Sequence, residues 1–191
     1  MMPSKGSEMD AKPVTHDGTR WSNADADRVE IVEPDSSWPS RFEEEARALR
    51  AVLPTVWGLH IEHFGSTAIP GLRAKPIIDI LIVHPAPDLW HSLVDPLASL
   101  DYVYWAENPR RDRMFFVKGM PPFGSGRSHH VHIRLPDDAR AELIFRDALR
   151  ANLTLARRYA ELKDVLAVRY ASDRNAYTDA KTKFVTEVLN A

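Results

Sequence analysis

The segment from Ile77 to Val83 most constrains the fold of this chain, because six of its seven residues are aliphatic and the remaining one is Asp79. An aliphatic run of this length, starting beside Pro76, predicts a strand over 76–83 that is covered on both faces. An ionised carboxylate in such a strand is costly unless it is paired, hydrogen-bonded or bound to a metal. We therefore interpret Asp79 as a metal ligand or general base. A carboxylate paired with a buried arginine or a backbone donor is the structural alternative.

Apolar residues elsewhere in the chain alternate between strand spacing and helix spacing. The strand pattern covers residues 29–33, 57–64, 76–83, 102–107, 113–118 and 130–135. The helical pattern covers residues 38–53, 88–99, 137–151, 154–170 and 173–189. This order predicts an α/β (α+β) fold, in which a mixed β-sheet is flanked by helices and followed by a C-terminal helical segment.

Residues 1–27 contain no isoleucine, leucine, phenylalanine or tyrosine. A segment of this composition cannot bury enough apolar surface to offset the entropy that is lost when it becomes ordered. We therefore expect a disordered N-terminal tail over 1–28. The rest of the chain, over 29–191, is long enough to form one folded domain with a hydrophobic core.

The absence of cysteine excludes a disulfide scaffold, a thiolate metal site and a cysteine nucleophile. The 25 lysines and arginines nearly balance the 27 aspartates and glutamates, so the chain lacks the basic excess that drives non-specific binding to nucleic acid or membranes. No apolar run approaches the roughly 18 residues of a membrane span, and the first residues lack the apolar stretch of a secretory signal. We expect a cytoplasmic protein without a membrane or nucleic-acid partner, and the sequence leaves its oligomeric state open.

The turn Gly65-Ser66-Thr67 lies between an apolar strand and the strand that carries Asp79. A glycine lets the backbone approach a ligand closely, and consecutive N–H groups with two hydroxyls can hold a phosphate. Such residues are common in loops, so the turn is informative mainly through the carboxylate in the next strand. Together they predict a phosphate site beside a metal ligand, as magnesium-dependent phosphoryl chemistry requires.

Histidines supply the next candidates. His130 and His132 face the same side of their predicted strand, because side chains alternate along a strand. Two imidazoles on one face can share a metal or line an anion pocket, and a pair of hydrogen-bonded surface histidines is the alternative. Glu62 and His63 lie on opposite faces of their strand, so only one of them can face Asp79. His63 is therefore a further candidate metal ligand.

Four basic residues are candidate phosphate ligands. Arg113 and Lys118 flank a predicted strand, where a solvated end of a hairpin is the commoner explanation. Lys181 interrupts an otherwise apolar helical stripe, and its ammonium group either reaches the site or extends past the core to solvent. Lys75 directly precedes the strand of Asp79, a position that also suits an ordinary turn.

The segment from Glu62 to Ile80, EHFGSTAIPGLRAKPIIDI, resembles the signature of the GrpB family of bacterial proteins. Shorter blocks are also similar to that family, and they lie at residues 34–42, 130–132, 145–150, 159–163 and 173–184. The resemblance covers roughly residues 29–190.

This resemblance implies a nucleotidyltransferase fold. In active members of that superfamily a Gly-Ser turn holds the nucleotide phosphates. Carboxylates at i and i+2 of one strand, with a third from a neighbouring strand, bind two magnesium ions. Gly65 and Ser66 match the turn, and Asp79 matches the first carboxylate. Leu81 stands at the i+2 position, and the third position falls on the strand over 130–135, which offers imidazoles instead.

Three functions remain open on this basis. The first is metal-assisted transfer of a nucleoside monophosphate from a nucleoside triphosphate to an unknown acceptor, with Asp79 and His130 or His132 as ligands and catalytic groups. The second is a catalytically degenerate module that binds a nucleotide or another phosphorylated small molecule, and Leu81 favours it. The third is a metal-dependent phosphoester hydrolase. The expected cofactor is a divalent ion, and the sequence does not distinguish magnesium, manganese and zinc.

Overall fold

The computed structural model describes residues 28–54, 58–106, 108, 110–119, 123–124 and 126–191. The strands of its sheet are β1 (His60–Phe64), β2 (Ile78–Val83), β3 (Tyr102–Tyr104), β4 (Met114–Lys118) and β5 (His129–Arg134). The α-helices are α1 (Trp38–Val52), α2 (Val94–Ala98), α3 (Pro136–Ala151), α4 (Leu153–Arg169), α5 (Arg174–Asp179) and α6 (Thr182–Leu189). The 3₁₀ helices in the described part of the chain are η3 (Ser66–Ala68) and η4 (Pro87–Leu93).

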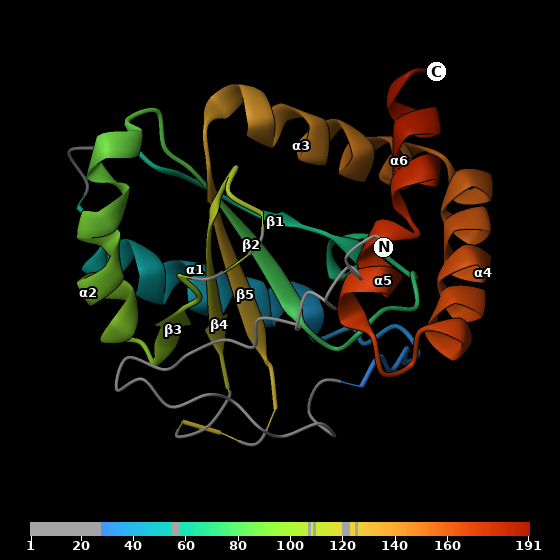
Figure 1. The fold of residues 1–191 in the computed structure, drawn as a ribbon, viewed down its shortest axis with the longest axis horizontal. Coiled ribbons are helices and arrows are strands. Elements are labelled where there is room, and N and C mark those ends of the chain that lie inside the picture. The colour runs from blue at the N-terminus through green and yellow to red at the C-terminus, as the bar shows by residue number, and fades with distance from the viewer. Residues whose placement is uncertain (1–27, 55–57, 107, 109, 120–122, 125) are drawn as a thin grey trace, which may run out of the picture.

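The sheet has the strand order β1-β2-β5-β4-β3 (Figure 1). The central strands β2 and β5 are parallel, and the other neighbouring pairs are antiparallel. Helices flank this mixed sheet, so the predicted fold class is confirmed.

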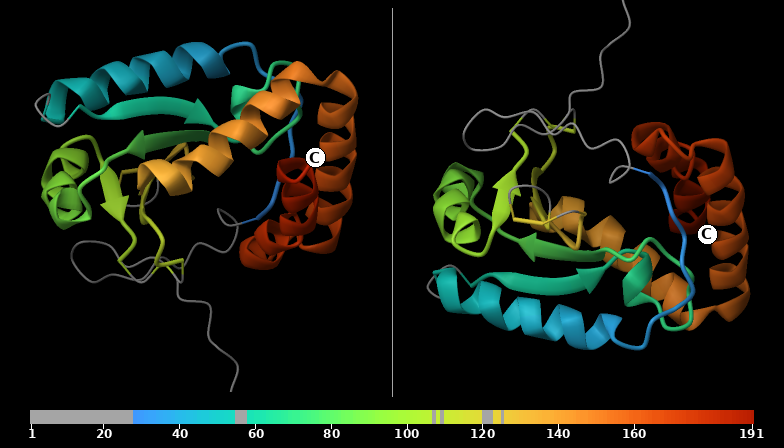
Figure 2. Two further views of the ribbon diagram at one scale, coloured as in Figure 1. Left: turned by 90° about the horizontal axis from the view of Figure 1, so that it is seen from above. Right: turned by 90° about the horizontal axis from the view of Figure 1, so that it is seen from below.

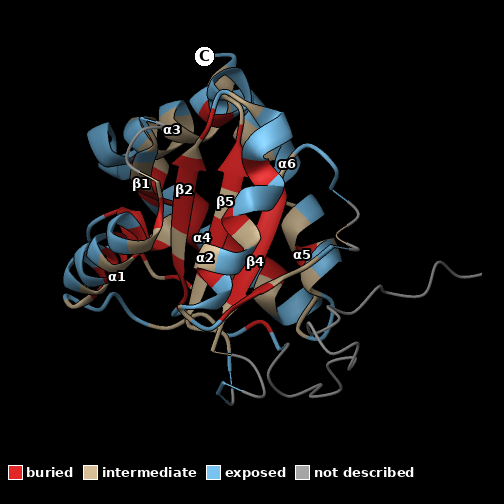
Figure 3. Ribbon diagram, turned by 90° about the vertical axis from the view of Figure 1, so that its left-hand side faces the viewer, coloured by how far each residue is buried: buried red, intermediate tan, exposed pale blue. Residues whose placement is uncertain are grey.

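One face of the sheet is covered by α1 and the segment that contains η4 and α2. Along α1, residues at helical spacing such as Trp38, Phe42 and Leu49 are buried. They belong to the same cluster as Ile78, Ile80 and Ile82, whose side chains all point to this face of β2. Figure 3 shows the resulting buried centre, with β2, β4 and β5 largely in the colour of buried residues.

The opposite face of β2 is covered only in part. Leu81 is completely buried and packs with Phe64 and with Ala139 of α3. Asp79, at the other end of the same face, lies beyond the cover of α3, and 28% of its side chain is exposed. The prediction that this strand is covered on both faces is therefore confirmed at Leu81 but wrong at Asp79, where part of the side chain is exposed.

The last three helices gather at the end of the sheet that lies farthest from α2 (Figures 1 and 2). Rings of Phe145, Tyr159 and Phe184 pack against one another between α3, α4 and α6. Val29 packs with Leu166 and Tyr177 beside the same helices. The predicted C-terminal helical segment thus forms a wall next to the open part of the sheet.

Three predicted elements differ from the structure. Residues 29–33 form only an isolated bridge between Val32 and Ala74, because Pro34 and Pro76 have no N–H to extend the pairing. The predicted helix over 88–99 is η4 followed by α2, because Pro96 can only be accommodated in a first helical turn. The predicted helix over 173–189 is α5 and α6, separated where Lys181 N–H donates to the carbonyl of Thr178 three residues earlier.

The predicted tail lies outside the described residues, apart from Arg28. Within the described part of the chain, no helix is both long enough and apolar enough to cross a membrane.

Candidate functional site

A cavity of about 830 Å³ lies between the open face of the sheet and the C-terminal helices. The described residues that line it include nine arginines and lysines but only three acids, which are Asp79, Glu142 and Asp173. A cavity with this excess of positive charge attracts and concentrates anions.

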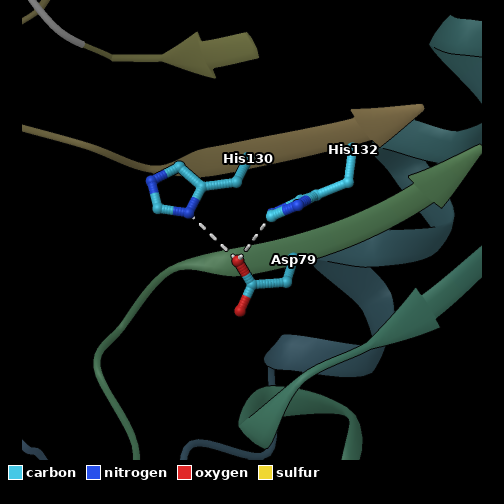
Figure 4. Close-up of side chains that lie close together, drawn as sticks. All are labelled: Asp79, His130 and His132. Atoms are coloured by element: carbon cyan, nitrogen blue, oxygen red, sulfur yellow. Dashed lines mark hydrogen bonds and ion pairs between the residues drawn. The ribbon is translucent and has the colours of Figure 1, made fainter. Parts of the chain in front are cut away.

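Asp79, His130 and His132 come together in this cavity (Figure 4). The parallel register of β2 and β5 places Asp79 opposite His130, and strand alternation brings His132 to the same face. His130 Nδ1 lies 3.0 Å from Asp79 Oδ1, and His132 Nε2 lies 4.0 Å from the same oxygen. One oxygen and two nitrogens of these side chains lie within 4.8 Å of one another, which is the spacing of a candidate metal centre.

The three side chains differ in charge at neutral pH. Burial raises the pKa of Asp79, but the hydrogen bond from His130 and the electrostatic interactions with His130, His132 and Lys75 outweigh burial and hold that pKa at about 2. Burial lowers the pKa of His130 to about 4, against the opposing effect of the Asp79 carboxylate. Burial also holds the pKa of His132 well below its usual value. A carboxylate therefore faces two neutral imidazoles, which is the protonation state that metal ligation requires.

His130 also has one nitrogen without a partner. Its Nδ1 donates to Asp79, whereas its Nε2 is buried and has no hydrogen-bond partner among the described residues. Buried polar atoms of this kind are uncommon and often mark a ligand site.

The turn before β2 is built around Gly65. Its φ of 70° lies in the region that favours glycine, and a Cβ at this position would lie 2.5 Å from Asp79 Oδ2. Ser66 and Thr67 follow in η3 and line the cavity. The Thr67 hydroxyl donates to the Ile77 carbonyl and contacts His63, so it is already engaged within the protein. The glycine turn thus brings the backbone against the Asp79 carboxylate.

Three of the four predicted basic residues line the cavity, and these are Lys75, Lys181 and Arg113. The ammonium groups of Lys75 and Lys181 lie 5.5 and 4.3 Å from the centre of the same Tyr177 ring. Burial lowers the pKa of Lys181 to about 8 and that of Lys75 well below its usual value. Two lysines held together in this way are arranged for an anion with more than one negative charge.

Lys118 and His63 lie on the other face of the sheet. Lys118 pairs with Glu45 of α1 at 2.9 Å, and the His63 ring stacks on Phe42 of α1. Strand alternation places both side chains on the α1 face, so neither belongs to the cluster around Asp79. His63 is therefore not a candidate metal ligand, and Lys118 is not a candidate phosphate ligand.

The structure also adds a residue that sequence reasoning missed. Lys163 of α4 is buried, lines the cavity and donates to the backbone carbonyl of Arg73. It lies on the same helical stripe as Tyr159 and Leu166. A lysine within an apolar stripe is the sequence pattern that could have indicated a functional role for it. Burial lowers its pKa to about 7.

Comparisons with known proteins agree over most of the chain. The family model described as GrpB protein matches residues 28–191. A UPF0157 protein of Pseudomonas aeruginosa is 53% identical over 178 residues, which cover 93% of this chain and 73% of that protein. The crystal structure of GrpB from Enterococcus faecalis is 32% identical with a TM-score of 0.71, and the match covers 84% of this chain and 95% of that one. A dephospho-CoA kinase of Mycobacterium leprae is 27% identical over 75% of this chain, but the match spans only 42% of that protein.

Proposed function

This chain belongs to the GrpB family, and we propose that its cavity binds a nucleotide or a related phosphorylated small molecule together with a divalent metal ion. The observation that carries the proposal is that nine basic residues line the same cavity as the carboxylate of Asp79 and the imidazoles of His130 and His132. A polyphosphate would compensate the positive charge of the basic side chains, and a cation would compensate the negative charge of the carboxylate.

The phosphate part of the proposal rests on charge and size. Lys75, Lys181 and Arg113 line one cavity with the Gly65-Ser66 turn, and together they supply several donors to a chain of phosphate oxygens. A volume of about 830 Å³ falls within the range of small-molecule sites and is ample for a nucleoside triphosphate. The aromatic ring of Trp105 in the lining offers a surface on which a base can stack.

The metal part of the proposal rests on the donor set. One carboxylate oxygen with two imidazole nitrogens suits manganese, zinc or iron(II), whereas magnesium prefers oxygen ligands alone. Asp79, His130 and His132 would hold the ion, and the pKa values of all three already favour the ligating forms. When bound, such an ion neutralises charge on phosphate oxygens.

Nucleotidyl transfer is the reaction that we propose for this arrangement. An acceptor oxygen would attack the α-phosphorus of a nucleoside triphosphate, and pyrophosphate would leave with the electron pair of the broken P–O bond. The proton of the acceptor would leave to solvent, because the lone pairs of His130 and His132 are committed to the ion.

Binding without turnover is the second candidate, and Leu81 favours it. This residue stands where active nucleotidyltransferases carry their second carboxylate, and it is completely buried against Phe64 and Ala139. A single carboxylate leaves the leaving group with less metal assistance than two would provide.

Calorimetric titration with ATP, GTP, CTP and UTP, each with and without Mn²⁺, tests the binding proposal. We expect at least one of them to bind the wild-type protein with Mn²⁺ and to bind the Asp79→Asn variant far more weakly. Incubation with α-labelled nucleoside triphosphates and cell extract then separates the reactions. Label in a new product supports transfer, free nucleoside monophosphate indicates hydrolysis, and unchanged triphosphate indicates binding alone. Absence of binding by all four nucleotides in every condition would contradict the proposal.

A further inference from the structure

We infer that Arg113 couples phosphate binding to metal binding. Its guanidinium contacts Nδ1 of His132, and this contact must break before His132 can ligate a metal. The inference rests on the proposed function and adds a regulatory role for one residue of the same site.

The first step is the contact between Arg113 and His132. Arg113 Nη1 lies 3.4 Å from His132 Nδ1. A guanidinium has only donors, so the Nδ1 atom of His132 accepts and the proton of this neutral imidazole resides on Nε2. The Nε2–H group then points toward Asp79 Oδ1, which is 4.0 Å away.

The second step follows from the needs of metal ligation. A ligating imidazole offers a lone pair to the metal and donates its other N–H to an oxygen acceptor. The nitrogen of His132 near Asp79 is Nε2, so the proton must move to Nδ1 before Nε2 can ligate. With Arg113 in place, an N–H on Nδ1 would face another donor. The present position of Arg113 and metal ligation by His132 therefore exclude each other.

The third step concerns how Arg113 is held. Its Nε and Nη2 atoms donate to the two carboxylate oxygens of Asp112 at 3.1 and 3.0 Å. Asp112 also pairs with Arg134, which in turn pairs with Glu142 on the cavity lining. This network fixes two of the three guanidinium nitrogens and leaves Nη1 to contact His132.

A phosphate in the cavity changes this balance. Arg113 lines the cavity, and an anionic phosphate oxygen is a much stronger acceptor for a guanidinium than a neutral imidazole nitrogen. Because the guanidinium is rigid, phosphate binding draws Nη1 away from His132 by pulling the whole group off Asp112 as well. This shift frees Nδ1 to carry the proton and pairs the guanidinium charge beside the metal site with phosphate. By thermodynamic linkage, the metal must strengthen phosphate binding by the same factor.

Titration with Co²⁺, followed by visible absorption, tests the inference with a metal whose spectrum reports imidazole ligation. Phenyl phosphate serves as the phosphate probe because it chelates divalent ions only weakly. We expect phenyl phosphate to raise the Co²⁺ affinity of the wild-type protein at least tenfold. In Arg113→Met, we expect Co²⁺ alone to bind at least tenfold more tightly than it binds wild type, and phenyl phosphate to change that affinity less than threefold.

Arg111→Met is the matched control. Arg111 lies two residues before Arg113, donates to the backbone carbonyl of Ala106 and is not part of the cavity lining, so removal of its charge is an equal change in charge outside the site. We expect this variant to retain the wild-type coupling. Asp112→Asn is a second variant, because it weakens the anchor of Arg113 while keeping the guanidinium, and we expect tighter binding of Co²⁺ alone. Circular dichroism verifies that each variant is folded.

The outcomes separate the inference from the proposed function. Unchanged coupling in folded Arg113→Met, or equal effects of Arg113→Met and Arg111→Met, would overturn the inference while leaving the proposed site intact. Tight Co²⁺ binding to wild type without any phosphate effect would do the same. No Co²⁺ binding in any arm would overturn both the inference and the metal part of the proposed function.

Discussion

His130 Nδ1 lies 3.0 Å from Asp79 Oδ1, across the parallel pairing that places these two residues directly opposite each other in the centre of the sheet. The contact explains how an aspartate is tolerated in an aliphatic strand. A hydrogen bond to a charged group stabilises the folded chain by about 1.5 to 3 kcal/mol, and the cavity leaves part of the carboxylate in contact with solvent. The same contact orients His130, so one pair of residues serves both stability and the proposed site.

Asp79→Asn tests the carboxylate. The amide is isosteric but neutral, so we expect the affinity for Mn²⁺ to fall more than about 100-fold, since loss of an outer partner of a metal ligand already costs about 10- to 100-fold. Because Asp79 is partly exposed, the fold should remain. Calorimetry and circular dichroism measure the two quantities, and an unchanged Mn²⁺ affinity would exclude Asp79 as a ligand.

His130→Ala and His132→Ala should both weaken Mn²⁺ binding, but they should differ in stability. His130 is the more buried and makes the shorter contact with Asp79, so we expect its loss to cost about 1 to 2 kcal/mol more in the free energy of unfolding. His129→Ala is the control, because this neighbouring histidine contacts Ser128 and lies on the other face of β5. Urea denaturation and Mn²⁺ titration check all three. A His129→Ala variant that loses Mn²⁺ as the others do would argue against the site.

Gly65→Ala and Gly71→Ala form a matched pair. Both glycines have a positive φ, near 70°, so alanine costs about 1 to 3 kcal/mol of backbone strain at each. Only at Gly65 would the added Cβ also collide with the Asp79 carboxylate, whereas open space surrounds it at Gly71. We expect Gly65→Ala to lose ligand and metal binding and Gly71→Ala to retain both. Equal binding by the two folded variants would show that the close approach of Gly65 to Asp79 has no role in the site.

The lowered pKa of Lys163 predicts that the free energy of unfolding depends on pH. Its folded-state pKa is about 7 and its ordinary value is 10.5, so between these pH values the unfolded chain binds more protons than the folded chain. Stability must therefore rise with pH across that window, by at most about 1.4 kcal/mol for each pH unit. Relative to Lys163→Met, we expect the wild-type protein to gain about 2 to 3 kcal/mol between pH 7 and pH 9.5. Urea denaturation at a series of pH values measures this, and a constant difference between the two proteins would contradict the shift.

The sequence predicted the proximity of Asp79 to His130 and His132 because the relevant information is local. Strand alternation puts both histidines on one face, and an acid in an aliphatic strand marks where that face must open. The sequence did not show on which face of the sheet His63 and Lys118 lie, because alternation along a strand shows only which residues share a face. Which face meets the cavity depends on the register with neighbouring strands and on where α1 packs.

Other parts of the site depend on contacts far apart in the chain. Lys163 becomes a cavity residue only because α4 lies against the turn that contains Arg73, and the anchoring of Arg113 requires Asp112, Arg134 and Glu142 to meet from separate elements. The division of residues 173–189 into α5 and α6 has no proline or glycine to signal it. Helical spacing already places Lys181 beside the Tyr177 ring, four residues earlier, so only the approach of Lys75 to the same ring depends on contacts far along the chain.

The most direct test of the central claim is a crystal structure of the protein soaked with Mn²⁺ and an α,β-methylene nucleoside triphosphate, using anomalous scattering to locate the metal. We predict one Mn²⁺ ligated by Asp79, His130 and His132, with phosphate oxygens next to it and within reach of Lys75 and Lys181. A nucleotide bound elsewhere, or Mn²⁺ that avoids these three side chains at saturating concentration, would contradict the claim.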